Sequence, residues 1–437
     1  MLQLAIGSPA QRSPYRSDLL EIEFLGGASE VGRSSILLRG EKKILLDCGI
    51  KVDHGSRNAY PMPAGPVDAF ILSHAHLDHS GFAPSLYLSR NPVSFGTQPT
   101  LNLSELLIED SMKIERETHN SPKFFNRQLK AFRNNYIGME YGKEADFTDL
   151  TISFSDAGHI PGSAVTSIQN SRTDRRLVYT GDFRLEPQML HGGAKIAKSD
   201  VLITESTYST SDHPDRTDVI SEFVEDVKAV VETRGTALLP CFAVGRAQEL
   251  LAVLQSNGLM ENTFIDGMAK AATSIILQDK GFISNAGLLQ EAWDSVVMVD
   301  GPAQRKAALR GGSVVVTTAG MLNGGPIMNY ITRANDRSKV FLTGYQADGT
   351  NGRKITEGRQ IDVNGRKFKL RIPHAFYDFS AHAGRSEILR YVKESSPETV
   401  FCVHGDRENT NHLAEELRSE GYDAYSPMLG DRVRIEF

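Results

Sequence analysis

Three histidines and one aspartate fall within six consecutive positions, directly after a short apolar run over residues 69–72. The run predicts a buried strand, and side chains two positions apart in an extended segment point to the same face. His74, His76 and Asp78 can therefore converge, and His79 can reach them from the turn that follows. Neutral imidazoles with one carboxylate form a ligand set that suits zinc. The alternative, a polar loop with incidental histidines, fits this tight spacing poorly.

Four more ionisable side chains stand at or just beyond the ends of predicted strands. They are His159 after residues 152–154, Asp182 after residues 177–179, Glu205 after residues 201–204, and His404 after residues 400–403. Loops at the edge of a sheet commonly carry binding and catalytic side chains. Taken alone, His159 and Asp182 are weak signals for a site. An acid such as Glu205 at the end of an apolar strand is more unusual, and its alternative role is a structural cap on the following turn.

Two other residues are candidates for supporting roles. Asp47 lies near the end of a strand predicted over residues 43–49. A metal-bound imidazole needs a partner on its second nitrogen, so we expect Asp47 to orient one. The alternative is a turn residue before a glycine. The other candidate is His382, in the segment Phe-Ser-Ala-His-Ala-Gly.

The composition is that of an ordinary soluble protein with about two domains. The chain has 437 residues, 40% of them hydrophobic and 23% charged. No apolar run approaches the roughly 20 residues needed to span a bilayer. Residues 1–18 are polar and predict a disordered extension rather than a secretory signal. The three cysteines are far apart in apolar settings, which favours buried free thiols in a reducing cytoplasm.

The net charge of −6 seems at first to argue against a polyanionic substrate. Two bound zinc ions would bring it to about −2, and bound metals dominate the local field. Residues 351–371 carry seven basic side chains against two acidic ones, and residues 113–133 are also rich in lysine and arginine. Either stretch could be only a solvated face, so charge alone decides nothing.

From residue 236 to about residue 350, predicted strands alternate with helices and glycine-rich loops. Such units build a parallel sheet whose loops can face a phosphate backbone. A helix predicted over residues 217–235 precedes them, with Gly235 as its expected C-terminal cap. This second α/β unit has no ligand set of its own.

Taken together, the motifs resemble the β-CASP branch of the metallo-β-lactamase superfamily, over roughly residues 19–437. The resemblance implies an α/β fold in which a metallo-β-lactamase αββα sandwich is split by an inserted parallel-sheet β-CASP domain. The sandwich would comprise residues 19–206 and 376–437, and the inserted domain residues 207–375. The cleft between them would hold the substrate.

The resemblance also implies a centre of two Zn²⁺ ions. By that resemblance His74, His76 and His159 hold the first zinc, Asp78, His79 and His404 hold the second, and Asp182 bridges both. A metal pair ~3.5–4 Å apart suits phosphodiester hydrolysis. In the family His382 acts as general acid and Glu205 pairs with it, beside the catalytic carboxylates Asp78 and Asp182. One departure is Gly384, where the family commonly has aspartate; we expect it to affect loop geometry rather than activity.

Finer resemblance concerns the substrate. A histidine at the position of His404 is typical of RNA-processing members of the family. Residues 26–34, 242–249 and 319–326 look like the endonuclease subunit of the cleavage and polyadenylation specificity factor, in the form of its short archaeal homologues without KH domains. The expected partner is therefore single-stranded RNA, with a possible homodimer or RNA-processing complex and no membrane. The expected RNA contacts are Arg246, Arg353 and Lys354.

The leading hypothesis is a cytoplasmic two-zinc ribonuclease that cuts single-stranded RNA endonucleolytically in 3′-end processing or decay. An alternative of the same class is a 5′-to-3′ exoribonuclease like ribonuclease J. An alternative of another class is a non-catalytic scaffold subunit of an RNA-processing complex, although such partners usually lose ligands. A small-molecule thioesterase or lactamase would leave the inserted domain and His382 without a role.

Overall fold

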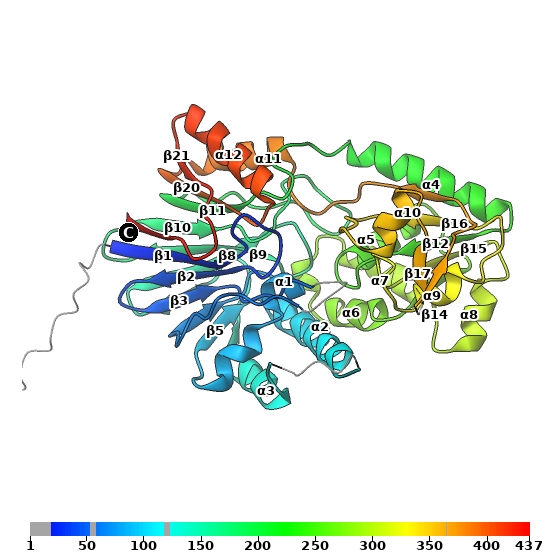
Figure 1. Ribbon diagram of the computed structural model, residues 1–437, viewed down its shortest axis with the longest axis horizontal. Coiled ribbons are helices and arrows are strands. Elements are labelled where there is room, and N and C mark those ends of the chain that lie inside the picture. The colour runs from blue at the N-terminus through cyan, green and yellow to red at the C-terminus, as the bar shows by residue number, and fades with distance from the viewer. Residues whose placement is uncertain (1–18, 53–57, 118–122, 364) are drawn as a thin grey trace, which may run out of the picture.

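The computed structural model describes residues 19–52, 58–117, 123–363 and 365–437. The disordered extension expected over residues 1–18 lies outside this part of the chain. Figure 1 shows an elongated molecule with one lobe built from the beginning and the end of the chain and a second lobe built from its middle. The middle of the chain is therefore an insertion into the first lobe.

The first sheet of the sandwich has the strand order β22-β1-β2-β3-β4-β5-β6. Its strands are β22 (Arg432–Glu436), β1 (Leu19–Gly26), β2 (Ser35–Arg39), β3 (Lys43–Leu46), β4 (Ala69–Ile71), β5 (Val93–Gly96) and β6 (Tyr136–Gly138). The final strand runs antiparallel to the first, with Leu19 opposite Glu436. Strands from the beginning and the end of the described chain thus pair within one sheet.

The second sheet has the order β21-β20-β11-β10-β9-β8-β7. Its strands are β21 (Asp423–Tyr425), β20 (Thr399–Val403), β11 (Val201–Glu205), β10 (Arg176–Tyr179), β9 (Ala164–Asn170), β8 (Leu150–Asp156) and β7 (Glu144–Phe147). It packs face to face on the first sheet through buried apolar side chains, and the rings of Phe24 and Phe401 meet there at 5.3 Å between centroids. Burying both inner faces fixes the alternation of apolar residues along these strands.

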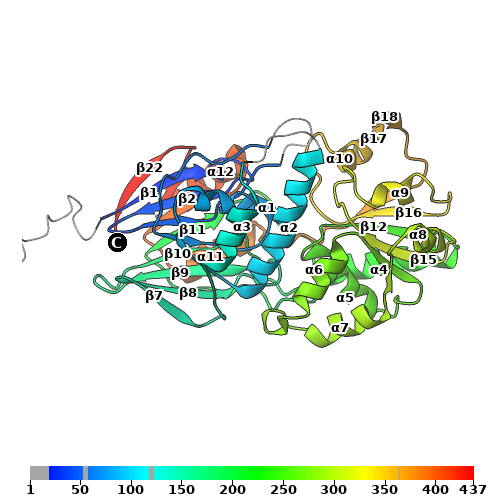
Figure 2. The same cartoon turned by 90° about the horizontal axis from the view of Figure 1, so that it is seen from below.

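Helices cover the outer faces of the two sheets (Figure 2). On the first sheet, α2 (Gln98–Glu117) and α3 (Asn126–Asn134) bury Ile108 and Phe132 against the strands. On the second, α11 (Arg385–Ser395) and α12 (Arg407–Ser419) bury Tyr391 and Leu413. These four layers are the αββα sandwich that the sequence predicted.

The inserted unit is built on a sheet of order β14-β13-β15-β12-β16-β19, in which every pairing is parallel. Its strands are β14 (Val297–Met298), β13 (Thr263–Asp266), β15 (Ser313–Thr317), β12 (Thr236–Pro240), β16 (Lys339–Leu342) and β19 (His374–Phe376). Successive residues of β12 point to opposite faces, so Leu239 packs with one core and Leu238 with the other. The predicted parallel sheet is confirmed.

Helices flank both faces of this sheet. The first core includes α4 (Arg216–Glu232), α5 (Arg246–Ser256), α6 (Ala269–Ile276) and α7 (Ala286–Ser295). The second includes α8 (Pro302–Ala308), α9 (Ile327–Ile331) and α10 (Asn351–Thr356), next to the hairpin of β17 (Ile361–Val363) and β18 (Arg366–Phe368). Parallel strands need such cover on both faces because both are apolar.

Two local predictions were wrong. The strand predicted over residues 43–49 ends at Leu46, because Asp47 adopts a left-handed backbone with a φ of 54°. The helix predicted over residues 217–235 ends at Glu232, and Arg234, with a φ of 60°, takes the left-handed position expected for Gly235. The amide of Gly235 then donates to the carbonyl of Val230, which is the hydrogen bond of a Schellman motif.

Cys48, Cys241 and Cys402 are buried free thiols. Burial raises the pKa of Cys241 and of Cys402 to about 12, so both stay protonated. None of the helices in the described parts of the chain combines the length and the apolar character needed to cross a lipid bilayer.

Candidate metal centre

All seven predicted ligands meet in two adjoining groups beside α1 (Leu77–Ser80), a helix on the side of the sandwich that faces the inserted unit (Figure 1). The loop after β4 and the short helix α1 (Leu77–Ser80) supply four of them, His74, His76, Asp78 and His79. The other three follow the ends of β8, β10 and β20 and are His159, Asp182 and His404. The ends of strands that are far apart in sequence thus converge in one place.

The first group of ligand atoms comes from His74, His76, His159 and Asp182, and these atoms lie within 4.8 Å of one another. His159 Nε2 is 3.1 Å from His76 Nδ1, and His74 Nε2 is 3.5 Å from Asp182 Oδ2. The second nitrogen of His159 lies 2.9 Å from the carbonyl oxygen of Ala381. A backbone acceptor there fixes the tautomer and turns the lone pair of Nε2 toward the group.

The second group comes from Asp78, His79 and His404, again within 4.8 Å of one another. His404 Nε2 lies 3.3 Å from Asp78 Oδ2 and 3.3 Å from His79 Nε2. The backbone of His404 is left-handed, with a φ of 48°, and its amide donates to the carbonyl of Gly27. This sparsely populated conformation directs the ring of His404 toward the group.

Asp182 lies between the two groups. Its Oδ2 is 3.5 Å from His74 Nε2 in the first group and 3.3 Å from His79 Nε2 in the second. Its Oδ1 is 3.1 Å from His404 Nδ1. One carboxylate therefore contacts ring nitrogens of both groups, which is the position of a bridging ligand.

The donor atoms fit bound metal ions. Within the described residues, His74 Nε2 and Asp182 Oδ1 are buried and make no hydrogen bond. Burial, followed by the charge of His79, lowers the pKa of His74 well below its usual value, so this imidazole is neutral. Burial raises the pKa of Asp182, but the imidazoles of His404 and His79 outweigh it and keep the carboxyl ionised. Burying such ligand atoms without hydrogen bonds is costly unless a bound cation interacts with them.

Asp47 contacts Nδ1 of His79, the ring nitrogen that faces away from the second group, as the sequence led us to expect. Its Oδ2 is 2.7 Å from His79 Nδ1, and it also accepts hydrogen bonds from Ser73 and Tyr179, each at 2.7 Å from the donor oxygen. Asp47 is fully buried. With Nδ1 of His79 held in this way, Nε2 faces the second group.

Gly49 is a site residue that the sequence analysis did not identify. A Cβ atom placed on Gly49 would lie 1.7 Å from the carbonyl oxygen of Asp78. The neighbouring amides of Cys48 and Ile50 donate to the carbonyls of His79 and Leu77. The strand end therefore runs directly under α1, and only glycine leaves room for it.

His382 pairs with Glu205 beside the predicted ligands. His382 Nδ1 lies 2.9 Å from Glu205 Oε2, and Glu205 Oε1 accepts a hydrogen bond from the amide of Phe183 at 2.8 Å. Burial lowers the pKa of His382, but the Glu205 and Asp182 carboxylates outweigh it and raise the pKa to about 9. The imidazole thus carries a proton near neutral pH, and its ring lies 4.8 Å from that of His159 between centroids.

The structure explains why a glycine stands at position 384. A Cβ atom on it would lie 2.9 Å from Asp212 Oδ1 and 3.4 Å from His213 Cδ2. Its amide donates to Glu387 Oε2 at 2.9 Å and so begins α11. The segment that carries Asp212 occupies the space of a larger side chain, in line with the expected effect on loop geometry.

The three predicted RNA contacts do not lie together in one place. Arg353 and Lys354 are on α10 of the inserted unit, and Arg353 donates to Glu357 at 2.7 Å. Arg246 begins α5, and its Nε and Nη1 atoms are buried. The sequence did not single out Arg184 and Arg216. Burial lowers the pKa of both Arg216 and Arg246, the positive charge of Arg184 lowers both further, and the charge of Arg246 also lowers the pKa of Arg216.

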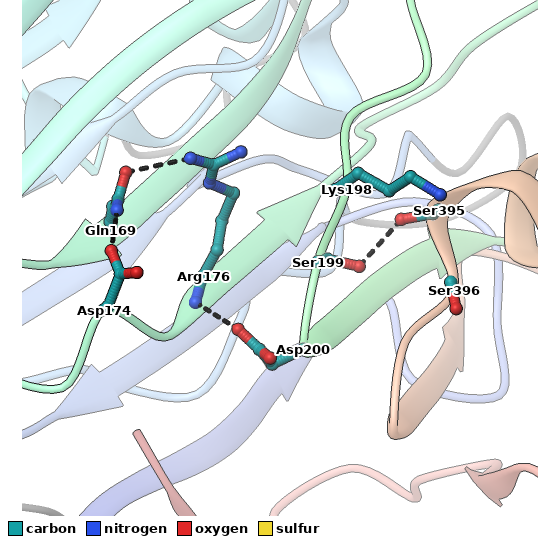
Figure 3. Close-up of a pocket in the computed structure, with 8 residues that line it drawn as sticks. All are labelled: Gln169, Asp174, Arg176, Lys198, Ser199, Asp200, Ser395 and Ser396. Carbon is teal, nitrogen blue, oxygen red and sulfur yellow. Dashed lines mark hydrogen bonds between the residues drawn. The ribbon is translucent and has the colours of Figure 1, made fainter.

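A hollow of about 350 Å³ elsewhere on the sandwich is no competitor for this site (Figure 3). It lies where β10 and β11 begin, whereas the predicted ligands follow the ends of strands. Its polar groups are already paired, with Arg176 donating to Gln169 at 2.9 Å and the hydroxyls of Ser199 and Ser395 2.8 Å apart.

Known protein families match successive parts of the chain. A model described as the Beta-Casp domain matches residues 247–355. A model described as the Zn-dependent metallo-hydrolase RNA specificity domain matches residues 370–427. A third, described as anti-Pycsar protein Apyc1, matches residues 27–227. The description of the second model names a Zn-dependent metallo-hydrolase and specificity for RNA.

Individual proteins match over nearly the whole chain. "Probable RNase MJ4" of Methanocaldococcus jannaschii is 36% identical, over 95% of this chain and 100% of that protein. "RNase aCSPSF2" of Saccharolobus solfataricus is 34% identical, over 95% of this chain and 85% of that protein. "Transcription termination factor FttA" of Methanothermobacter thermautotrophicus is 32% identical, over 98% of this chain and 73% of that protein.

A solved structure of a protein of unknown function from Enterococcus faecalis shares the fold, with a TM-score of 0.62 at 14% identity over 95% of this chain and 100% of that one. The sandwich with its inserted parallel sheet, the two ligand groups and the matched families agree with one another. The chain belongs to the β-CASP family of metallo-β-lactamase-fold ribonucleases and resembles the short archaeal members of that family.

Proposed function

We propose that this chain is a two-zinc ribonuclease that cuts single-stranded RNA endonucleolytically, in RNA 3′-end processing or decay. The observation that carries the proposal is the position of Asp182, whose carboxylate contacts imidazoles of both ligand groups. A shared carboxylate between two N/O ligand groups is what a bridged metal pair requires. The relatives named as RNases support RNA as the substrate.

In this proposal His74, His76 and His159 hold one zinc, Asp78, His79 and His404 hold the other, and Asp182 bridges them. Zinc in these positions would supply a hydroxide at neutral pH and stabilise negative charge on the phosphoryl oxygens. Asp47 keeps His79 in the tautomer that presents Nε2. Asp78 and Asp182 add the negative charge that such a centre needs.

His382 acts as general acid in the proposed reaction. Its Nδ1 is committed to Glu205, so its Nε2 is the nitrogen available to a substrate. Water first loses a proton to the solvent, and the resulting hydroxide oxygen forms a bond to phosphorus while the bond from phosphorus to the leaving ribose oxygen breaks. That oxygen takes the proton from His382 Nε2, and the Glu205 carboxylate stabilises the imidazolium before the transfer.

The proposed domain boundaries place the inserted domain at residues 207–375, between two parts of the sandwich at residues 19–206 and 376–437. Pairing of β19 with β16 supports ending the insertion close to Phe376. Substrate would then lie between the two domains, next to the ligand groups. A cytoplasmic location and assembly as a homodimer or in an RNA-processing complex complete the proposal.

The alternatives differ in what they leave unexplained. A scaffold subunit has no use for the complete set of ligands together with the His382–Glu205 pair, because buried polar clusters without a function are costly. A thioesterase or lactamase gives no role to the inserted sheet. An exoribonuclease like ribonuclease J uses the same chemistry and differs only in how the RNA is anchored, so it is the second candidate.

The experiment that tests the proposal compares a circular single-stranded RNA with its linear 5′-monophosphate counterpart, each incubated with zinc-loaded protein. A circle has no end from which an exonuclease could start. Cleavage of the circle that is lost in the His76→Ala variant is the expected result. Degradation of the linear RNA alone would replace the endonuclease assignment with the exonuclease one, and absence of cleavage of both would contradict the ribonuclease proposal.

A further inference from the structure

Three arginines meet at the junction of the sandwich and the inserted unit. Arg184 follows β10 two positions after Asp182, Arg216 is the first residue of α4, and Arg246 is the first residue of α5. We call these three residues the arginine cluster. From the sequence we expected Arg246 to contact RNA, whereas Arg184 and Arg216 have no assigned role.

Two members of the arginine cluster bind the loop that carries His382. Arg184 Nη1 donates to the carbonyl oxygen of Ser380 at 2.6 Å, and Arg216 Nη2 donates to the same oxygen at 2.5 Å. The hydroxyl of Ser380 in turn lies 3.2 Å from the amide of His382. Arg184 is 3% exposed, so its guanidinium is held inside the protein beside the general acid.

The guanidinium groups are incompletely paired. Nε of all three arginines, together with Nη1 of Arg216 and of Arg246, is buried without a hydrogen-bond partner among the described residues. Among the described residues, none of the three arginines forms an ion pair. Burying a cation without an anion or acceptors is strongly unfavourable.

The nearby carboxylates are engaged elsewhere. Glu249 accepts from the amides of Met189 and Leu190, at 2.9 and 3.3 Å. Asp378 pairs with His213 at 2.8 Å and accepts from the amide of Ser380. Burial, followed by repulsion within the cluster, lowers the pKa of Arg216 to about 9, and burial lowers that of Arg246 to about 10. Glu249 and Asp378 act electrostatically on Arg216 and Arg246, but their hydrogen bonds go to other groups, so the free guanidinium nitrogens lack acceptors.

A phosphodiester can supply the hydrogen-bond acceptors that the free nitrogens of the cluster lack. It carries one negative charge and two free oxygens, which match the planar donor pairs of guanidinium groups. We propose that Arg184, Arg216 and Arg246 bind a phosphodiester of the RNA strand that neighbours the one being cleaved. This inference rests on the proposed function, because the cleaved linkage must lie within reach of His382, whose carbonyl oxygen is 3.5 Å from Arg184 Nη1.

The experiment measures binding of a short single-stranded RNA, made uncleavable by 2′-O-methyl groups, to the zinc-loaded protein. A series of probes carries one neutral methylphosphonate linkage at each position in turn. Wild-type protein is expected to lose roughly 10- to 100-fold in affinity at one linkage next to the cleavage site, which is the effect of removing a charge-assisted hydrogen-bonding group. Sensitivity at that linkage should disappear in the Arg246→Gln variant.

Matched variants separate binding from folding. Arg172→Gln, an exposed arginine in the turn between β9 and β10, should keep the wild-type methylphosphonate profile. Arg216→Lys keeps the charge but loses the planar donor pair, so an intermediate loss is expected. Equal sensitivity at every linkage in wild-type protein would overturn the inference, and that measurement needs no variant.

The inference and the proposed function can fail separately. If wild-type protein cuts RNA and the methylphosphonate profile is flat, the arginine cluster only supports the His382 loop, and the inference is wrong while the ribonuclease proposal stands. If wild-type protein neither binds nor cuts RNA, both are wrong.

Discussion

The second oxygen of Glu205, 2.8 Å from the amide nitrogen of Phe183, ties the partner of His382 to the loop that carries Asp182. Glu205 is fully buried at the end of β11 and cannot turn away from the imidazole. A carboxylate anchored at both oxygens fixes the ring of His382, whose Nδ1 lies 3.9 Å from Asp182 Oδ2. The proposed general acid and the proposed ligands are different residues, so separate variants can test their roles.

His382→Ala should keep the bound metal and lose most cleavage, by roughly 100- to 10,000-fold, which is the usual contribution of a general acid. Asp182→Ala should lose metal and activity together, because its carboxylate contacts both groups. Zinc content by elemental analysis and cleavage rate, measured on the same preparations, check both expectations. A His382→Ala protein that cleaves RNA as fast as wild type would contradict the general-acid assignment.

Gly49→Ala should disrupt the second ligand group without removing any ligand. The added methyl group would lie 1.7 Å from the carbonyl oxygen of Asp78, so α1 must move. Overpacking of this kind costs about 1–3 kcal/mol of stability. Zinc titration should show weaker binding, whereas Gly287→Ala, at a position with free space, should bind zinc as wild type does. Equal zinc affinity of the two variants would argue against this role of Gly49.

Asp156 gives the stability of the protein a defined pH dependence. Burial raises the pKa of Asp156 from 3.8 to about 6. Between these pH values the unfolded chain releases a proton that the folded chain keeps, so stability falls as pH rises from about 4 to 6 and is then constant. The total loss is at most about 3 kcal/mol, since one pKa unit corresponds to 1.36 kcal/mol.

Asp156→Asn should remove this loss, so the variant gains stability relative to wild type between pH 4 and pH 7. Thermal unfolding of metal-free protein at several pH values measures the difference. Asp423→Asn, at an exposed position, serves as the control. A constant difference between Asp156→Asn and wild type across this range would show that Asp156 ionises normally in the folded chain.

Tyr345 is an exposed aromatic residue in the loop that follows β16. Its side chain is 56% exposed, and burial of the rest, followed by the charge of Asp406 two positions after His404, raises its pKa. Stacking of a base on such a ring contributes about 1–3 kcal/mol, so Tyr345→Ala should weaken binding of single-stranded RNA by roughly 5- to 150-fold. Fluorescence anisotropy with a labelled RNA measures this.

Phe125→Ala is the control for Tyr345, because Phe125 is equally exposed, at 55%, but lies before α3 on the outer face of the sandwich. It should bind RNA as wild type does. Identical affinities of all three proteins would exclude a stacking role for Tyr345.

The local part of the site could be predicted from sequence because its chemistry is local. His74, His76, Asp78 and His79 lie within one strand end and one turn, so their spacing already indicates convergence. His159, Asp182 and His404 are far apart in the chain, and only the family resemblance connected them. Alternation of apolar residues predicted both the sandwich and the parallel sheet, because burial of strand faces decides that pattern.

The remaining features depend on close approaches that no spacing reveals. Asp47 was predicted to end a strand, but the strand stops one residue earlier, because Asp47 has a left-handed backbone and its carboxylate contacts His79. Arg184 and Arg216 belong to different structural units and meet only at the carbonyl of Ser380. Their shared charge becomes visible only when the fold brings them together.

The antiparallel pairing of β22 with β1 sets an order of events during synthesis of the protein. The first sheet cannot close until residues through Glu436 have left the ribosome, whereas the strands of the inserted sheet, from Thr236 to Phe376, all emerge earlier. His404 also emerges late, so the second ligand group is incomplete for most of translation. The first ligand group is complete once Asp182 has emerged, but the second waits for His404, so in the proposed centre the bridged metal pair can form only on an essentially finished chain.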